Sequence, residues 1–169
     1  MMKYGFLLFL LFQLSSLSAQ IKIFPCDQFG RKEFRASFEL VLGKFYVCDE
    51  VGMRDFYPIR QVKGNSIYTC NETGFYESQP TFIVESGKIY RCNELGMKDF
   101  NATALIENGK FYLCNEFGSK NFNPSIIQEN TKIYLCDEYG NKGFYPSYFA
   151  EGGLSQIELI LLAERLGLL

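Results

Sequence analysis

One feature constrains this chain more than any other: a single segment recurs six times at a constant period of 22 residues. Its clearest copy is residues 110–124, KFYLCNEFGSKNFNP. A cysteine marks each copy, and a glycine follows it four positions later. The cysteines are Cys26, Cys48, Cys70, Cys92, Cys114 and Cys136, and the glycines are Gly30, Gly52, Gly74, Gly96, Gly118 and Gly140. A unit this short cannot bury an apolar face alone, so neighbouring units must share a core. These periodic residues are therefore assigned a structural role.

The fifth unit shows why each copy predicts a β-hairpin. Residues 110–114 are rich in aromatic and apolar side chains, as is typical of a strand. Asn115 can then bond backbone N–H groups ahead of it, and Gly118 can take a positive φ, which together predict a type I turn with a G1 bulge. A second extended run is expected over residues 119–122. Pro124 must bend or end that run, because proline donates no ladder hydrogen bond.

The fold class that follows is all-β. Six hairpin units, starting near residues 22, 44, 66, 88, 110 and 132, are expected to stack in an elongated array or meander over residues 20–153. Asn-Gly at 108–109 predicts a tight turn between neighbouring strands. Unit one is degenerate and unit three departs from the pattern, since Ser78 stands where the other units have phenylalanine. Terminal repeats are commonly atypical because one face has no neighbour.

Residues 154–169 predict a short C-terminal α-helix. Ser155 and Glu158 form a capping box, and Leu159, Leu162 and Leu166 follow at helical spacing. We expect this helix to cover the open end of the last repeat, because exposed sheet edges invite aggregation. The alternative is a helix that docks onto a partner or a membrane surface.

Residues 1–19 have the pattern of a secretory signal peptide. Lys3 supplies a positive charge, an apolar run follows, and small residues lead to an expected cleavage after Ala19. The apolar run is too short to span a bilayer, which needs about 20 residues. The mature chain is therefore expected to be secreted, periplasmic or at the cell surface, without a transmembrane segment.

Export would place the six cysteines in an oxidising compartment, where an even number suggests disulfides. The chain contains no histidine and no C-x-x-C motif, so Cys–His catalysis and the common zinc signatures are excluded. In a single-coil β-helix, equivalent cysteines would lie within disulfide reach, whereas hairpins place them about 10 Å apart, two strand spacings. We favour the hairpins, with thiols that are free or only partly paired.

Acidic residues at the turns could bind calcium through carboxylate oxygens or act as a glycosidase pair. The calcium loop D-x-D-x-D-G is absent, and no unit is singled out from its copies as an active site would be. No metal, cofactor or catalytic residue is therefore expected, and the chain is not predicted to be an enzyme.

Two aromatic columns recur with the period. The tyrosines are Tyr46, Tyr68, Tyr90, Tyr112 and Tyr134, and the phenylalanines are Phe34, Phe56, Phe100, Phe122 and Phe144. When exposed, such ladders stack on sugars or quaternary ammonium groups. We expect both columns to pack in the core instead.

The pattern Gly-Lys-aromatic-Tyr-x-x-[Asp/Asn]-x-x-Gly over residues 109–118 resembles two β-hairpin repeat families. One is the choline-binding or cell-wall-binding repeat, and the other is the WG (KWG) repeat of bacterial secreted proteins. The resemblance extends over all six units. It implies hairpins stacked in an elongated array that serves adhesion or binding.

These features predict an exported, non-enzymatic binding module at the cell envelope or outside the cell, with a polymer or a protein as its partner. The expected binding face carries the repeated side chains Lys98, Lys120, Lys142, Glu94, Glu116 and Glu138. The alternative is a structural spacer or assembly subunit that docks through its C-terminal helix. A formal net charge of −2 and the lack of a basic run argue against nucleic acid.

Overall fold

The structure is a computed structural model that describes residues 20–169. Its strands are β1 (Ile21–Pro25), β2 (Phe38–Val41), β3 (Lys44–Val47), β4 (Arg60–Lys63), β5 (Ser66–Thr69), β6 (Phe82–Glu85), β7 (Lys88–Arg91), β8 (Ala104–Glu107), β9 (Lys110–Leu113), β10 (Ile126–Glu129), β11 (Lys132–Leu135) and β12 (Tyr148–Ala150). One helix, α2 (Gln156–Arg165), follows them. The expected signal peptide lies outside the described residues.

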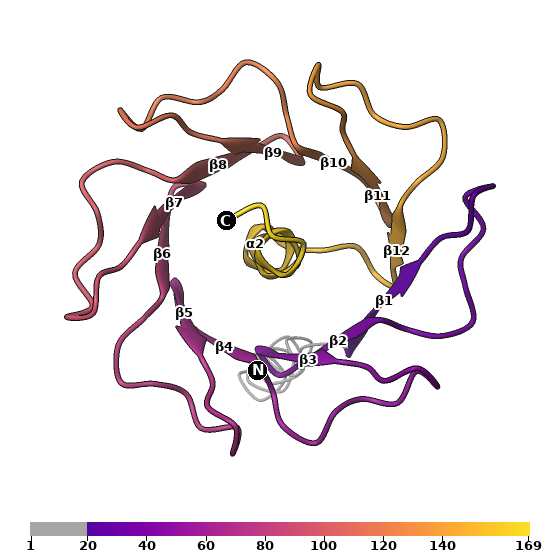
Figure 1. The fold of residues 1–169 in the computed structure, drawn as a ribbon, viewed down its shortest axis with the longest axis horizontal. Helices are drawn as coiled ribbons and strands as arrows, with labels where there is room; N and C mark the ends of the chain where they lie inside the picture. Colours follow the sequence, from indigo (N-terminus) through magenta and orange to yellow (C-terminus); the bar gives the residue numbers. More distant parts are fainter. Residues whose placement is uncertain (1–19) are drawn as a thin grey trace, which may run out of the picture.

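The strands form a closed antiparallel barrel in which each strand pairs with its neighbours in sequence, and β12 pairs with β1 (Figure 1). The all-β class and the repeated hairpins are confirmed. The elongated array is wrong, because the six units curve into a ring and the first meets the last. Closure leaves no unpaired strand edge at either end of the repeat series, which removes the aggregation hazard of an open sheet.

The first and last strands of the described chain form one hairpin together. Five hairpins join an even strand to the following odd strand, as in the pairing of Phe38 with Val47 and Leu40 with Phe45 between β2 and β3. The sixth combines β12 with β1, where Ile23 lies opposite Ala150. Within residues 20–169, the first strand, β1, is therefore the second strand of a hairpin, and the last strand, β12, is the first strand of the same hairpin.

Two kinds of connection alternate around the barrel. Tight turns link the strands of a hairpin, and both Asn108 and Gly109 take positive φ there (50° and 72°), as the Asn-Gly pair predicts. Long loops link one hairpin to the next. In an antiparallel barrel the two kinds must leave from opposite rims, so all the long loops leave from the same rim and fold outward (Figure 1).

The core lies inside the barrel. Alternate side chains of each strand point into the lumen, and Phe45, Phe82, Phe111, Ile67 and Ile133 are among those fully buried there. A barrel of about eight strands is just filled by its own side chains, so twelve strands leave room for more.

Helix α2 fills that room. It lies along the axis of the barrel (Figure 1), and Leu159, Ile160, Leu161, Leu162 and Ala163 are all buried. The capping box is confirmed, since the Ser155 hydroxyl accepts from the Glu158 N–H while the Glu158 carboxylate accepts from the Ser155 N–H. The expectation that the helix covers the end of an open array is wrong. Its consecutive apolar residues face every side, as suits an enclosed helix.

A partly buried ion pair anchors the helix to the wall. The Arg60 guanidinium, on β4, donates to the Glu164 carboxylate through Nε at 2.9 Å and through Nη2 at 2.6 Å. The Gln128 amide nitrogen, on β10, donates to the Leu154 carbonyl at 2.9 Å, ahead of the helix. These polar contacts join the helix and the residue ahead of it to β4 and β10, while the buried residues of the helix are apolar.

Candidate binding surface

Six outer loops surround the barrel, and we number them in chain order. Outer loops 1 to 6 are residues 26–37, 48–59, 70–81, 92–103, 114–125 and 136–147. Each begins with a cysteine that forms an isolated bridge to the residue six positions later, such as Cys114 to Lys120. The expected second strand over residues 119–122 is therefore reduced to this single bridge.

The turn of each outer loop forms as its sequence predicts. In outer loop 5 the Asn115 side-chain oxygen accepts from the N–H groups of Phe117 and Ser119, both at 3.0 Å. The Gly118 N–H donates to the Asn115 carbonyl at 2.9 Å, and Gly118 takes a φ of 74°. Asn or Asp is needed here because its side-chain oxygen accepts hydrogen bonds from two backbone N–H groups at the loop tip, where no neighbouring strand is available as a partner.

Each turn packs against the preceding outer loop. A Cβ on Gly74 would lie 2.8 Å from a ring carbon of Tyr57 and 3.0 Å from Pro58, so only glycine fits this contact. Side chains reach across in the same place: Asn101 donates to the Glu116 carbonyl at 2.8 Å, and Asn123 donates to the Glu138 carbonyl at 2.9 Å. The outer loops thus form one continuous ring instead of six independent arms.

The expected binding-face lysines take part in a repeated structural contact, which we call the cation clip. The ammonium groups of Lys98, Lys120 and Lys142 each lie 4.6 Å from the ring centroid of a tyrosine on the outer wall. Those tyrosines are Tyr90, Tyr112 and Tyr134. The same lysines pair with Glu85, Glu107 and Glu129. The hydrogen bond between Lys120 and Glu107 lowers the pKa of Glu107 and raises that of Lys120.

The expected binding-face carboxylates lie elsewhere. Glu94, Glu116 and Glu138 are exposed at the turn tips, and the lysines pair with other glutamates. Among the described residues, the ion pairs of these lysines therefore do not involve the turn carboxylates. The lysines brace the loops against the barrel, whereas the turn carboxylates remain in solvent.

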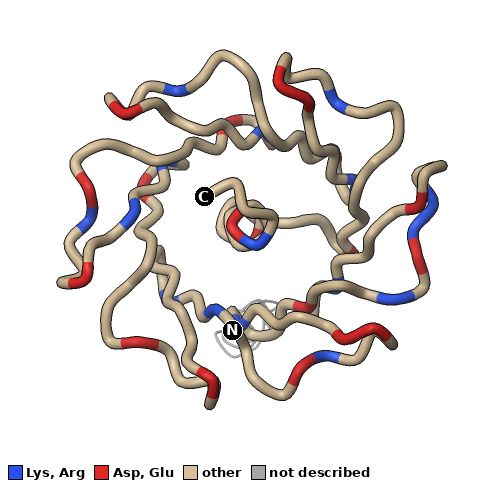
Figure 2. Tube along the Cα trace, viewed as in Figure 1, with Lys and Arg blue, Asp and Glu red and all other residues tan. Residues whose placement is uncertain are grey.

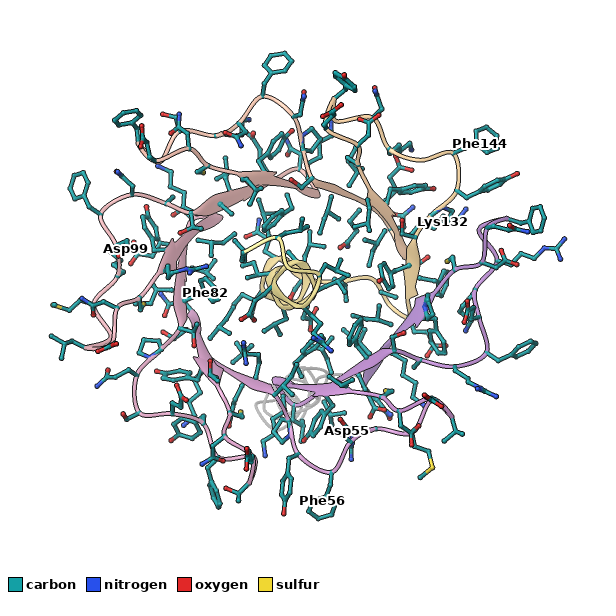
Figure 3. All side chains as sticks on the ribbon, in the orientation of Figure 1. Asp55, Phe56, Phe82, Asp99, Lys132 and Phe144 are labelled. Carbon is teal, nitrogen blue, oxygen red and sulfur yellow. The ribbon has the colours of Figure 1, made fainter. Side chains whose placement is uncertain are left out.

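The phenylalanine column differs most from the expectation of core packing. Phe34, Phe56, Phe100, Phe122 and Phe144 are exposed, with relative accessibilities of 103%, 87%, 99%, 98% and 91%. Figure 3 shows Phe56 and Phe144 directed away from the barrel, while Phe82 points into it. The expectation that this column packs in the core is wrong. We call these five side chains the phenylalanine ring.

The turn tips add further apolar surface. Phe29, Val51, Leu95, Phe117 and Tyr139 occupy equivalent turn positions and are all more than half exposed. A globular protein rarely places so much apolar surface at its loop tips without a partner for it. The sequence carried one signal of this exposure, because polar turn residues immediately surround each of these side chains.

The tyrosine column lies on the outer wall of the barrel instead of in the lumen. Tyr46 and Tyr134 are buried and the other three are half-buried. The ring of each is covered by a neighbouring side chain, with Arg54 lying 4.6 Å above Tyr46. Burial was therefore correctly expected for two tyrosines, but the outer loops and the cation clips provide it.

Unit three lacks the clip of the other units. Tyr76 replaces the lysine or arginine, and its ring contacts Tyr68 edge-on at a centroid distance of 5.5 Å. Lys63 replaces the glutamate and lies 3.4 Å from the Tyr76 ring centroid. With Ser78 in place of phenylalanine, outer loop 3 is the one unit that interrupts the phenylalanine ring.

All six cysteines are free. Burial of each thiol raises its pKa. The thiolate is the reactive form, so these thiols are poor nucleophiles and poor metal ligands at neutral pH. Their place beside the strand ends fits a packing role.

Hollows open between neighbouring outer loops. The hollow between outer loops 2 and 3 has a volume of about 490 Å³ and is lined by Asp55, Phe56, Tyr57 and Glu72, among others. A hollow of about 550 Å³ lies between outer loops 3 and 4, and one of about 510 Å³ between outer loops 6 and 1. The repeat thus produces several similar recesses beside the exposed apolar tips.

Within residues 20–169 no group of three or more histidine, cysteine or acidic side chains is arranged to hold a metal ion. The one helix of this part of the chain is too short to cross a bilayer.

No protein-family model matches the chain, and a search of curated proteins finds no match.

Proposed function

We propose that this chain is an exported binding module that holds a polymer or a protein outside the cell through the phenylalanine ring. The observation that carries the proposal is the near-complete exposure of five equivalent phenylalanines. Exposed aromatic side chains of this size are favoured anchors in interfaces, because they bury much apolar area at little entropic cost.

The fold does not need these side chains. Ser78 occupies the same position in outer loop 3, where the turn and the bridge from Cys70 to Tyr76 still form. The phenylalanines therefore support a role in contact with another molecule.

Repetition supports a partner with several attachment points. Equivalent residues of a closed ring of equal units lie at the same height along the barrel axis. The phenylalanines thus form a belt of similar groups around the molecule, apart from the gap at Ser78. A repeating polymer or a large protein can engage more than one of them, and linked contacts strengthen binding far beyond a single site.

Docking through the C-terminal helix has less support. Leu159 and Leu162 are buried, with relative accessibilities of 2% and 0%, so their side chains already have partners within the barrel.

The test is co-sedimentation with insoluble peptidoglycan and a panel of polysaccharides, using the wild-type chain and a variant with all five ring phenylalanines changed to serine. Serine is chosen because position 78 shows that the loop accepts it. We expect saturable pelleting of the wild type and loss of pelleting in the folded variant. Equal pelleting of both would refute the phenylalanine ring as the contact. No pelleting with any polymer would exclude the polymer and leave a protein partner.

A further inference from the structure

The ring of outer loops is uneven in charge. Outer loop 1 carries three cationic and two acidic residues, whereas outer loop 2 has one cation and three carboxylates. Outer loop 3 carries two carboxylates and no lysine or arginine. Figure 2 shows the cationic residues of outer loop 1 gathered on one side of the molecule. The molecule therefore has a basic loop at one place on its rim and an acidic pair of loops at another.

The hollow between outer loops 2 and 3 combines rings with carboxylates. Phe56 and Tyr57 stack edge-on at a centroid distance of 4.8 Å on one side. Asp55 and Glu72 also line the hollow. Neither carboxylate forms an ion pair within residues 20–169. Two carboxylates beside two exposed rings make a place for a cationic side chain with an apolar stem.

Outer loop 1 presents such a side chain at its tip. Arg31 forms no ion pair within the described chain, and its guanidinium lies 5.8 Å from the Phe29 ring centroid. The other two cations of this loop are engaged, since Lys32 pairs with Glu151 and Arg35 donates to the Glu50 carbonyl. Arg31 is the cation that remains available for a contact outside the chain.

The chain already uses this combination within itself. In the cation clip a lysine lies over a tyrosine ring and pairs with a carboxylate, as Lys98 does with Tyr90 and Glu85. The hollow between outer loops 2 and 3 has rings and carboxylates without a cation. At the tip of outer loop 1, Arg31 lies beside the Phe29 ring, and Asp27 accepts the backbone N–H groups of its own turn. Glu33 lines the same hollow as Arg31 but forms no ion pair with it.

We propose that a second copy of the chain completes the contact: Arg31 of one molecule enters the hollow between outer loops 2 and 3 of the next. Outer loop 2 separates this hollow from outer loop 1 in the ring, so the contact is made between molecules. Donor and acceptor are different surfaces, which makes the contact heterologous. Each added molecule leaves one donor and one acceptor free, so association continues into chains of copies unless the rotation closes a ring.

The contact has the properties of a small charged interface. It involves loop tips, so we expect weak and reversible association. Salt screens exposed charges beyond about 10 Å at 0.1 M ionic strength, so added salt must weaken it.

The test is sedimentation velocity of the whole chain over a concentration series, at about 20 mM and about 500 mM salt. The wild type is expected to self-associate at low salt. Arg31→Glu and Glu72→Lys should each raise the dissociation constant at least about tenfold. An equimolar mixture of the two variants should associate again, because Arg31 of the Glu72→Lys variant meets the unaltered hollow of the Arg31→Glu variant. Glu116→Lys, at the equivalent turn position of outer loop 5, is the matched control and should change association less than about twofold.

Several results would overturn the proposal. A wild type that stays monomeric throughout the series would do so. So would equal weakening by Glu72→Lys and Glu116→Lys, which would indicate general charge effects, or a mixture that fails to associate. Circular dichroism establishes that each variant is folded. Since the variants keep all five ring phenylalanines, polymer binding is tested separately, and either proposal can fail while the other stands.

Discussion

The lumen of the barrel and the outer loops use the same residue in opposite ways. Phe111 is fully buried against the core, whereas Phe122, eleven residues later in the same unit, is 98% exposed. Both positions have equivalents in every unit: the Phe111 position is always phenylalanine or isoleucine, and the Phe122 position is phenylalanine in all units but the third. Periodicity therefore shows that a residue has a repeated role, but it does not show whether that role is packing or contact with a partner.

The two regions also differ in what holds them together. Inside the barrel, apolar side chains from the strands close around α2, with Arg60 and Glu164 as a polar tie. The outer loops have turns capped by Asn or Asp and clips that join a cation, a ring and a carboxylate. Large changes in stability are therefore expected from lumen substitutions and small ones from loop substitutions.

The strongest test of this contrast is Leu162→Asp. Leu162 is completely buried between α2 and the barrel wall, so the change places an unpaired charge in the core. We expect a loss of more than about 4 kcal/mol in the free energy of unfolding, or no folded protein. Denaturant titration measures it.

Leu42→Asp is the matched control for that substitution. Leu42 is 66% exposed in a hairpin turn and takes a positive φ of 52°, which aspartate tolerates better than leucine. Little loss in the free energy of unfolding is therefore expected for Leu42→Asp. If Leu162→Asp stayed folded and lost only a partner, α2 would be a docking helix after all.

The next comparison changes one phenylalanine in each region. Phe111→Ala should cost about 3–5 kcal/mol, because it removes buried surface and leaves a cavity in the lumen. Phe122→Ala should lie within about 0.5 kcal/mol of the wild type, as is usual for exposed positions. Thermal or denaturant unfolding of both variants provides the measurement. Comparable losses would mean that the phenylalanine ring is packed, and would remove the basis of the proposed binding surface.

Loss of the ion pair between Arg60 and Glu164, which joins the helix to the barrel, should lower the free energy of unfolding by an intermediate amount. Glu164→Gln leaves the partly buried Arg60 guanidinium without its anionic partner, so we expect a loss of about 1–3 kcal/mol. Glu151→Gln is the control, because its pair with Lys32 is an exposed bridge that contributes at most about 1 kcal/mol. Equal effects would indicate that the helix position is set by apolar packing alone.

Much of the local structure could be predicted from the sequence, because short-range chemistry decides it. Asn115, Gly118 and the pair Asn108-Gly109 form the turns that their conformational preferences dictate. The capping box of Ser155 and Glu158 forms for the same reason. These interactions involve residues close together in the chain, so a single sequence is enough to recognise them.

Closure of the barrel could not be derived, because it depends on curvature summed over twelve strands. Two signals were nevertheless present. Within residues 20–169, the strand at 21–25 has no hairpin partner before it, and the strand at 148–150 has none after it. The run from Leu159 to Ala163 is apolar on every side, which suits an enclosed helix better than a covering one. The exposure of Phe122 followed from neither signal, because the 22-residue period does not distinguish a buried position from an exposed one.

The smallest expected effect on stability is a pH dependence that arises in the outer loops, from the Asp137 carboxylate. The Asn141 backbone N–H donates to the Asp137 carboxylate at 2.8 Å and, with further donors, holds the pKa of Asp137 below its usual value. A depressed folded-state pKa means that this carboxylate stabilises the turn above the unfolded pKa. That contribution is lost as the pH falls through the folded pKa. Asp137→Asn should abolish the pH dependence while keeping the turn, because asparagine caps the same turn at Asn115.

NMR titration of Asp137 in the wild type provides the measurement, with the buried Phe111 region as an internal reference. Signals from outer loop 6 should shift with a midpoint below the value of about 3.9 found for unstructured aspartate. Signals from the lumen should not shift with that midpoint, because apolar burial there involves no proton. A lumen that titrated together with Asp137 would show that the outer loops and the core are not energetically separate. In that case the apolar interior and the polar loops would differ in composition, but they would not unfold or respond to pH independently.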